Sequence, residues 1–161
     1  MLKRASFVAC AVALAGAPAV WAQANTRGEA KATIAGKAVV IDYGRPSLKG
    51  RDMLGQAVVG TPWRMGADAS TTLKTEADLA FGSAKVPKGS YYLTATKTAP
   101  DKWELNVASM ERAKIADVPL TVTSAADSVE LFTIELSVEQ AKGKLVMRWG
   151  TSVLSTDFSG Q

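Results

Sequence analysis

The stretch TLKTEADLAF, residues 72–81, alternates between two kinds of side chain. A period of two residues is typical of a β-strand that turns one face to a core and the other to water. The alternation therefore predicts a half-buried strand. Its inward face is expected to carry Leu73, Thr75, Ala77, Leu79 and Phe81, and its outward face Lys74, Glu76 and Asp78.

Further strands are predicted on both sides of this stretch. Gly36-Lys37 separates two apolar runs, as in a hairpin whose type II′ turn needs a positive φ at its first residue. Val86-Pro87-Lys88-Gly89 has the composition of a β-turn, and residues 110–116 are expected to form at most one helical turn. The predicted strands cover residues 32–34, 38–43, 72–81, 91–96, 103–107, 118–123, 129–138 and 144–154, with turns at 124–127 and 140–143.

About eight short strands, separated by turns at regular intervals, predict an all-β fold, an antiparallel β-sandwich of jelly-roll-like or related type. Trp103 and Trp149 share a strand face with apolar neighbours, so both are assigned to the core. Of Tyr91 and Tyr92 only one can point inward, because neighbours in a strand face opposite sides. The exception to the strand spacing is residues 44–70, and a loop of that length is commonly functional or disordered.

Residues 1–24 have the pattern of a signal peptide, with Lys3 and Arg4 before an apolar, alanine-rich run. Cleavage is predicted after Ala22 or Ala24. A membrane anchor is the alternative, but the run falls short of the roughly 20 residues that a span needs. The chain is therefore expected to be periplasmic or secreted, with a short leader at 25–30, one domain at 31–161 and no membrane span after cleavage.

The charge of the processed chain is close to neutral. Removal of Lys3 and Arg4 leaves seventeen of the nineteen basic residues against fifteen acidic ones, a net charge of +2. Nucleic-acid binding needs a concentrated basic face with many phosphate contacts, so no nucleic-acid partner is expected. The oligomeric state stays open.

Several kinds of catalytic site are excluded by the residue types that the chain lacks. There is no histidine, and the one cysteine, Cys10, lies in the predicted signal peptide. Catalytic triads, thiolate nucleophiles and histidine-zinc sites are thereby excluded, and no calcium-type loop of closely spaced acids occurs. No glycine-rich phosphate loop is present either. We therefore expect no cofactor and no metal, and the sequence assigns no catalytic residue.

The long loop concentrates the remaining polar chemistry. Guanidinium groups bind carboxylates or phosphates through paired hydrogen bonds, and a neighbouring tryptophan can wall off a sugar ring. This pattern predicts a non-catalytic binding or structural module that takes an anionic or carbohydrate small molecule. An alternative is that the arginines only hold the loop by donating to backbone carbonyls. The predicted ligand-binding residues are Tyr43, Arg45, Lys49, Arg51, Trp63 and Arg64.

Two further functions remain open on the sequence. A histidine-free hydrolase would use paired carboxylates, with Asp42 and Asp68 beside the loop as candidates. A Ser-Lys nucleophile formed by Ser47 and Lys49 is a weaker variant, since proximity in a loop does not establish hydrogen-bond reach. The third possibility is a protein-protein interaction domain in the cell envelope, which needs an exposed apolar patch or an open sheet edge.

Two motifs on the loop are shared with a known family. They are Tyr43-Gly44-Arg45-Pro46-Ser47-Leu48-Lys49-Gly50-Arg51 and Trp63-Arg64-Met65-Gly66-Ala67. With them the chain resembles a family of secreted bacterial proteins labelled as a domain of unknown function and numbered 2911. The resemblance extends through residues 86–91, 132–134 and 145–150 and so covers nearly all of the processed chain. It implies export and a β-rich domain, and it supplies no catalytic residues.

Overall fold

A computed structural model describes residues 26–161, which form ten β-strands and no helix. The predicted signal peptide lies outside the described residues. The strands are β1 (Thr26–Ile34), β2 (Lys37–Arg45), β3 (Pro62–Trp63), β4 (Thr72–Thr75), β5 (Leu79–Phe81), β6 (Ala84–Val86), β7 (Gly89–Ala99), β8 (Lys102–Ser109), β9 (Lys114–Glu139) and β10 (Lys142–Gly160).

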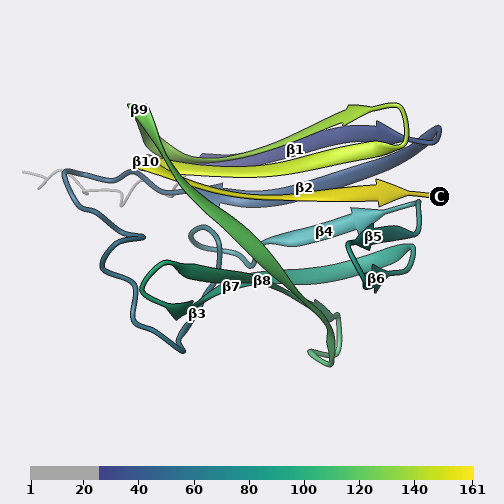
Figure 1. Cartoon of the computed structure of the whole chain (residues 1–161), viewed down its shortest axis with the longest axis horizontal. Coiled ribbons are helices and arrows are strands. Elements are labelled where there is room, and N and C mark those ends of the chain that lie inside the picture. Colours follow the sequence, from purple (N-terminus) through teal and green to yellow (C-terminus); the bar gives the residue numbers. More distant parts are fainter. Residues whose placement is uncertain (1–25) are drawn as a thin grey trace, which may run out of the picture.

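All strand pairs are antiparallel, in the order β1-β2-β4-β7-β8-β9-β10-β5-β6, and β3 pairs with β7. The sheet is not closed, and its two layers face each other across the core (Figure 1). In the first layer β9 pairs with β8, and it then crosses to the second layer, where it pairs with β10. The prediction of an all-β, sandwich-like antiparallel fold is confirmed.

The alternation in residues 72–81 is also confirmed. Its five inward positions are each at most 6% exposed, whereas Lys74, Glu76 and Asp78 are exposed. The single predicted strand is nevertheless two strands, because the chain bends between β4 and β5. The bend is held by the Thr75 hydroxyl, which donates to Ala77 O (2.8 Å).

The buried aromatic residues follow the prediction. Trp103 and Trp149 are each 4% exposed. Tyr91 is buried and Tyr92 is half-buried, so only one of the pair faces the core.

Several predicted boundaries are wrong. β1 begins at Thr26, so residues 26–30 pair with β2 and do not form a leader. The first hairpin turns at Ala35 and Gly36, whose φ values of 49° and 73° define a type I′ turn one residue earlier than predicted. Strand β2 reaches Arg45, and β3 interrupts the predicted loop.

In residues 110–127, the predicted strand 118–123 is confirmed as part of β9, and the predicted turn at 124–127 is wrong. In place of a helical turn, Ser109 and Ala113 close a tight turn, with the Ser109 N–H donating to Ala113 O (2.8 Å). Residues 124–127 lie within β9, and residues 125–128 bulge opposite Thr151, between the pairs Gly150–Val129 and Ser152–Ser124 of the β9–β10 ladder. A bulge bends a strand, and this one lies where β9 turns back over the core (Figure 1).

Strand β10 folds back in the same way. Gly150 has a φ of +62°, and the register with β9 shifts on both sides of it. The first half of β10 pairs with residues 133–139, and the second half pairs with residues 121–124 and then with β5. The two halves lie side by side, because the Gly160 N–H donates to Ala141 O (3.3 Å) and the Phe158 ring covers Gly143.

Candidate functional site

Two of the predicted ligand-binding residues, Tyr43 and Arg45, complete the hydrogen bonding of strand β9. The Tyr43 ring is 3% exposed, and its hydroxyl accepts from Ile134 N–H (2.9 Å) and donates to Ile134 O (3.3 Å). Arg45 Nε donates to Phe132 O (3.3 Å), and the same guanidinium donates to Thr133 Oγ1 (3.0 Å). Both side chains thus satisfy backbone groups on the edge of β9 that faces away from β10.

Trp63 belongs to an aromatic cluster in the core. Its ring stacks on Trp149 with centroids 5.9 Å apart and planes 14° apart. It also meets the edges of Trp103 (6.2 Å) and Phe132 (5.0 Å) at steep angles. Stacked and edge-to-face contacts of this kind stabilise a core. The indole therefore anchors the loop to the core. The sequence predicts the same side chain as a wall against a sugar ring.

The other three predicted residues remain at the surface. Arg51 Nε donates to Leu48 O (3.3 Å), and the Arg64 guanidinium donates to Asp68 O (3.0 Å). Lys49 is exposed. The arginines thus behave partly as the loop supports that the sequence left open as an alternative, and the six predicted residues are not brought together around one hollow.

The loop's backbone amides are occupied by the protein's own carboxylates. Glu130 Oε1 accepts from Lys49 N–H (3.0 Å) and from the Ser47 hydroxyl, and Asp52 Oδ1 accepts from Gly55 N–H (2.9 Å). The two carboxylates thus accept from the backbone N–H groups that an external anion would need. The pKa of Glu130 lies below its ordinary value, because the Ser47 hydroxyl and the Lys49 amide stabilise its charged form.

This arrangement offers little to the catalytic hypotheses. Ser47 is bound to Glu130, a carboxylate whose lowered pKa makes it a weak base. Asp42 forms an ion pair with Arg27, which also donates to Ala69 O (3.1 Å) next to Asp68. The Asp42 carboxylate is thus held by Arg27, whereas glycoside hydrolysis needs two carboxyl groups that flank the same bond.

A groove lies elsewhere, at the end of the molecule where the two halves of β10 meet β5. This groove has a volume of about 640 Å³, within the range of roughly 300–1,000 Å³ that is usual for small-molecule sites. It is lined by Ala80, Gly82, Ser137, Glu139, Lys142, Gly143, Lys144, Asp157, Phe158 and Ser159.

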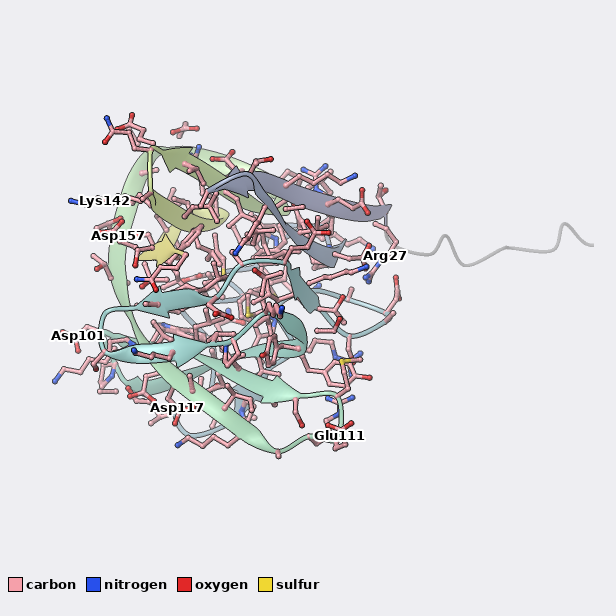
Figure 2. All side chains as sticks on the ribbon, turned by 90° about the vertical axis from the view of Figure 1, so that its right-hand side faces the viewer. Arg27, Asp101, Glu111, Asp117, Lys142 and Asp157 are labelled. Carbon is pink, nitrogen blue, oxygen red and sulfur yellow. The ribbon has the colours of Figure 1, made fainter. Side chains whose placement is uncertain are left out.

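Strand register arranges the polar lining residues on the outer face of the sheet. Lys142 lies opposite Glu139, and Lys144 lies opposite Ser137. Cross-strand partners of this kind have Cβ atoms about 4.5–5.5 Å apart on the same face. The fold-back of β10 brings Asp157 and Ser159 to the other side of the two lysines, and Figure 2 shows Lys142 and Asp157 close together. Arg27 lies at the opposite edge in that view.

The charges of the groove are unpaired. Within residues 26–161, the charged groups of Lys142, Lys144, Glu139 and Asp157 make no ion pair or hydrogen bond. Two positive and two negative groups therefore point to solvent around the same hollow. Such groups have spare donors and acceptors for a ligand.

The floor of the groove is closed by Phe158. Its ring lies against Gly143, where a Cβ atom would overlap it, and packs on Phe81 with centroids 5.6 Å apart. Phe158 itself is 4% exposed, so it supports the floor and presents little surface. A glycine is needed at residue 143 for this close approach.

The sequence did not indicate this site. The sequence predicts a turn at residues 140–143 and no site residue there. The available signal was the run of polar outward positions at 137, 139, 142, 144, 157 and 159. Only the fold-back at Gly150 brings 157 and 159 beside 142 and 144.

Residues 25–158 match the family model described as Protein of unknown function (DUF2911). This match covers most of the chain, and the chain belongs to that family, as its motifs indicated. No curated protein and no solved structure matches it.

Two properties of the described residues limit the kinds of site. Across residues 26–161, no three acidic, histidine or cysteine side chains are grouped as ligands for a metal ion. In the same part of the chain, no helix has the length and apolar character to cross a membrane.

Proposed function

We propose that this chain is an exported, non-catalytic binding domain, and that its ligand is a small sugar acid held in the groove between β5, β9 and β10. The observation that carries the proposal is the pair of unpartnered lysines, Lys142 and Lys144, flanked by unpartnered carboxylates in a hollow of about 640 Å³. The site differs from the loop that the sequence favoured, but the kind of ligand, anionic or carbohydrate, is the same.

The chemistry of the lining fits a ligand that combines an acid with hydroxyl groups. A carboxylate between Lys142 and Lys144 would receive charge-assisted hydrogen bonds. Glu139 and Asp157 accept hydrogen bonds only, which suits sugar hydroxyls. Because the four charges of the groove sum to zero, the groove itself suits one acid group and not a cluster of them.

Binding is favoured over turnover by the absence of an activated nucleophile. In the described chain, neither Ser137 nor Ser159 hydrogen-bonds to a lysine or carboxylate of the groove through its hydroxyl. A serine nucleophile needs an adjacent base within hydrogen-bond reach.

Isothermal titration calorimetry of the purified protein with galacturonate tests the binding proposal. Galactose, which lacks the acid, and acetate, which lacks the hydroxyls, serve as matched ligands. Lys142→Ala/Lys144→Ala should weaken galacturonate binding roughly tenfold or more, since two charge-assisted hydrogen bonds are lost. Lys49→Ala/Arg51→Ala on the loop removes the same charge and should leave affinity unchanged.

The reverse pattern, loss in the loop variant alone, would return the site to the loop. Equal binding of acetate and galacturonate would contradict a sugar acid as the ligand class. No binding of galacturonate would contradict the proposal as a whole.

The export part of the proposal rests on the signal-like residues 1–24 and has its own test. Expression of the full chain in a Gram-negative bacterium should yield a shortened protein outside the cytoplasm. N-terminal sequencing should then begin at Gln23 or Asn25. An uncut protein that stays in the cytoplasm would contradict export.

A further inference from the structure

A second hollow adjoins the groove. It has a volume of about 230 Å³ and lies over β5, β6 and the end of β10. The small residues Ala80 and Ser159 line both hollows, so the two hollows adjoin at these residues. Its lining consists of Asp78, Leu79, Ala80, Lys85, Val86, Pro87, Ser159 and Gln161.

Strand register places the two hollows along one line. Ser159 lies opposite Ala80, and Ala80 lies opposite Lys85. On the other side of Ser159 is Lys142, brought there by the fold-back of β10. Lys142 and Lys85 are therefore three strand spacings apart, roughly 14 Å at about 4.8 Å for each spacing.

Lys85 supplies the cation of the second hollow, which the Asp78 carboxylate also lines. Lys85 is exposed and makes no ion pair or hydrogen bond through its side chain in the part of the chain described. Asp78, by contrast, already accepts from the Lys88 N–H (2.8 Å). The second hollow thus offers the Lys85 ammonium as a donor, and the small residues Ala80 and Ser159 lie where it meets the groove.

We infer that the two hollows form one extended site for an acidic oligosaccharide that runs across the strands, with one acid group at Lys142 and Lys144 and another at Lys85. This inference rests on the proposed function. Both hollows are lined by side chains on the outer face of the sheet, and β5 is paired on both sides, with β10 and with β6. A ligand that crosses this face meets side-chain donors and acceptors, which are all that an oligosaccharide needs, whereas a peptide strand would bind along the free edge of β6.

The test compares galacturonate with tetragalacturonate on the purified protein. The tetramer should bind at least about tenfold more tightly, because the second contact forms within an already bound ligand. Lys85→Ala should remove roughly fivefold or more of the tetramer's affinity and leave galacturonate binding unchanged. Lys88→Ala is the matched control, since it removes a nearby lysine, in the connection between β6 and β7, that does not line the hollow.

The outcomes separate this inference from the proposed function. Galacturonate binding that depends on Lys142 and Lys144, with no gain for the tetramer, overturns the extended site and retains the groove. Equal effects of the Lys85 and Lys88 variants on the tetramer also overturn it. Tetraglutamate binding as tightly as tetragalacturonate overturns the oligosaccharide as the ligand class. If neither sugar acid binds, both proposals fail.

Discussion

The loop between β2 and β4 and the groove at β5, β9 and β10 both carry several charged side chains, but the two regions use them differently. In the loop, arginines and backbone amides are bound to carbonyls and carboxylates of the same chain. In the groove, two lysines and two carboxylates face solvent without partners in the described residues. A concentration of charge in the sequence is therefore a weaker sign of a binding site than charge that remains unsatisfied after folding.

The two regions also differ in how deeply they enter the core. The loop contributes Leu48, Leu54 and Met65, which are at most 9% exposed. Gly44 in β2 is so close to Ala67 that a Cβ atom would overlap the Ala67 carbonyl. The loop is thus packed as a structural element, while the polar residues of the groove lie on the outside of a completed sheet.

Among the variants that distinguish the loop from the groove, Trp63→Ala is expected to lower the free energy of unfolding most. Loss of the indole would leave a hole beside Trp103, Phe132 and Trp149, and large-to-small changes of this kind cost about 3–5 kcal/mol. Because Trp63 is only half-buried, we expect a loss of about 3 kcal/mol in urea unfolding. A loss below about 1 kcal/mol would show that the loop is not an anchored element.

A smaller effect is expected from Tyr43→Phe. The change removes the hydroxyl that pairs with the N–H and C=O of Ile134, and leaving a buried donor unsatisfied costs about 1–3 kcal/mol. Tyr92→Phe is the control, because the half-buried Tyr92 contacts the Arg112 guanidinium through its ring, which phenylalanine retains. Equal unfolding midpoints for the two variants would contradict the role assigned to Tyr43.

Glu130→Gln should change the pH dependence of stability. The folded-state pKa of Glu130 is lowered, first by the Ser47 hydroxyl and then by the Lys49 amide, so its charge stabilises the fold above the unfolded pKa of about 4.3. That contribution is lost as the pH falls from there through the folded-state pKa.

Urea unfolding of wild type and Glu130→Gln from pH 7 to pH 3 measures this difference. The gap between the two proteins should be constant near neutrality and shrink below about pH 4.3. Asp117 and Asp127, whose pKa values are also lowered by their hydrogen-bond partners, remain in both proteins and cancel in the comparison. A gap that does not change with pH would contradict the proposed support of the loop.

The smallest effect is expected from Lys142→Ala. The charged group has no partner in the described chain, so its removal should leave the urea midpoint unchanged. Together with a loss of ligand binding in Lys142→Ala/Lys144→Ala, this result would identify a residue kept for binding and not for stability. A clear drop in the midpoint would place Lys142 among the structural residues.

Much of the fold could be predicted because strand alternation is a local property. Leu73 and Phe81 were correctly assigned to the core from their spacing, and Trp103 and Trp149 from the faces they share with apolar neighbours. The candidate site could not be predicted in the same way. Asp157 and Lys144 are distant in the strand pattern, and no local periodicity shows that β10 folds back at Gly150.

The sequence alone determined the β class, the inward faces of the main strands, the signal-like first 24 residues, the family, and the kinds of catalytic chemistry that are absent. Tertiary structure decided which polar side chains find partners. Tyr43 and Arg45 reach the edge of β9, and Trp63 reaches Trp149, through contacts between segments far apart in the chain. The physical reason is that side-chain alternation follows from the geometry of a single strand, whereas the satisfaction of a charge depends on which strands lie beside it.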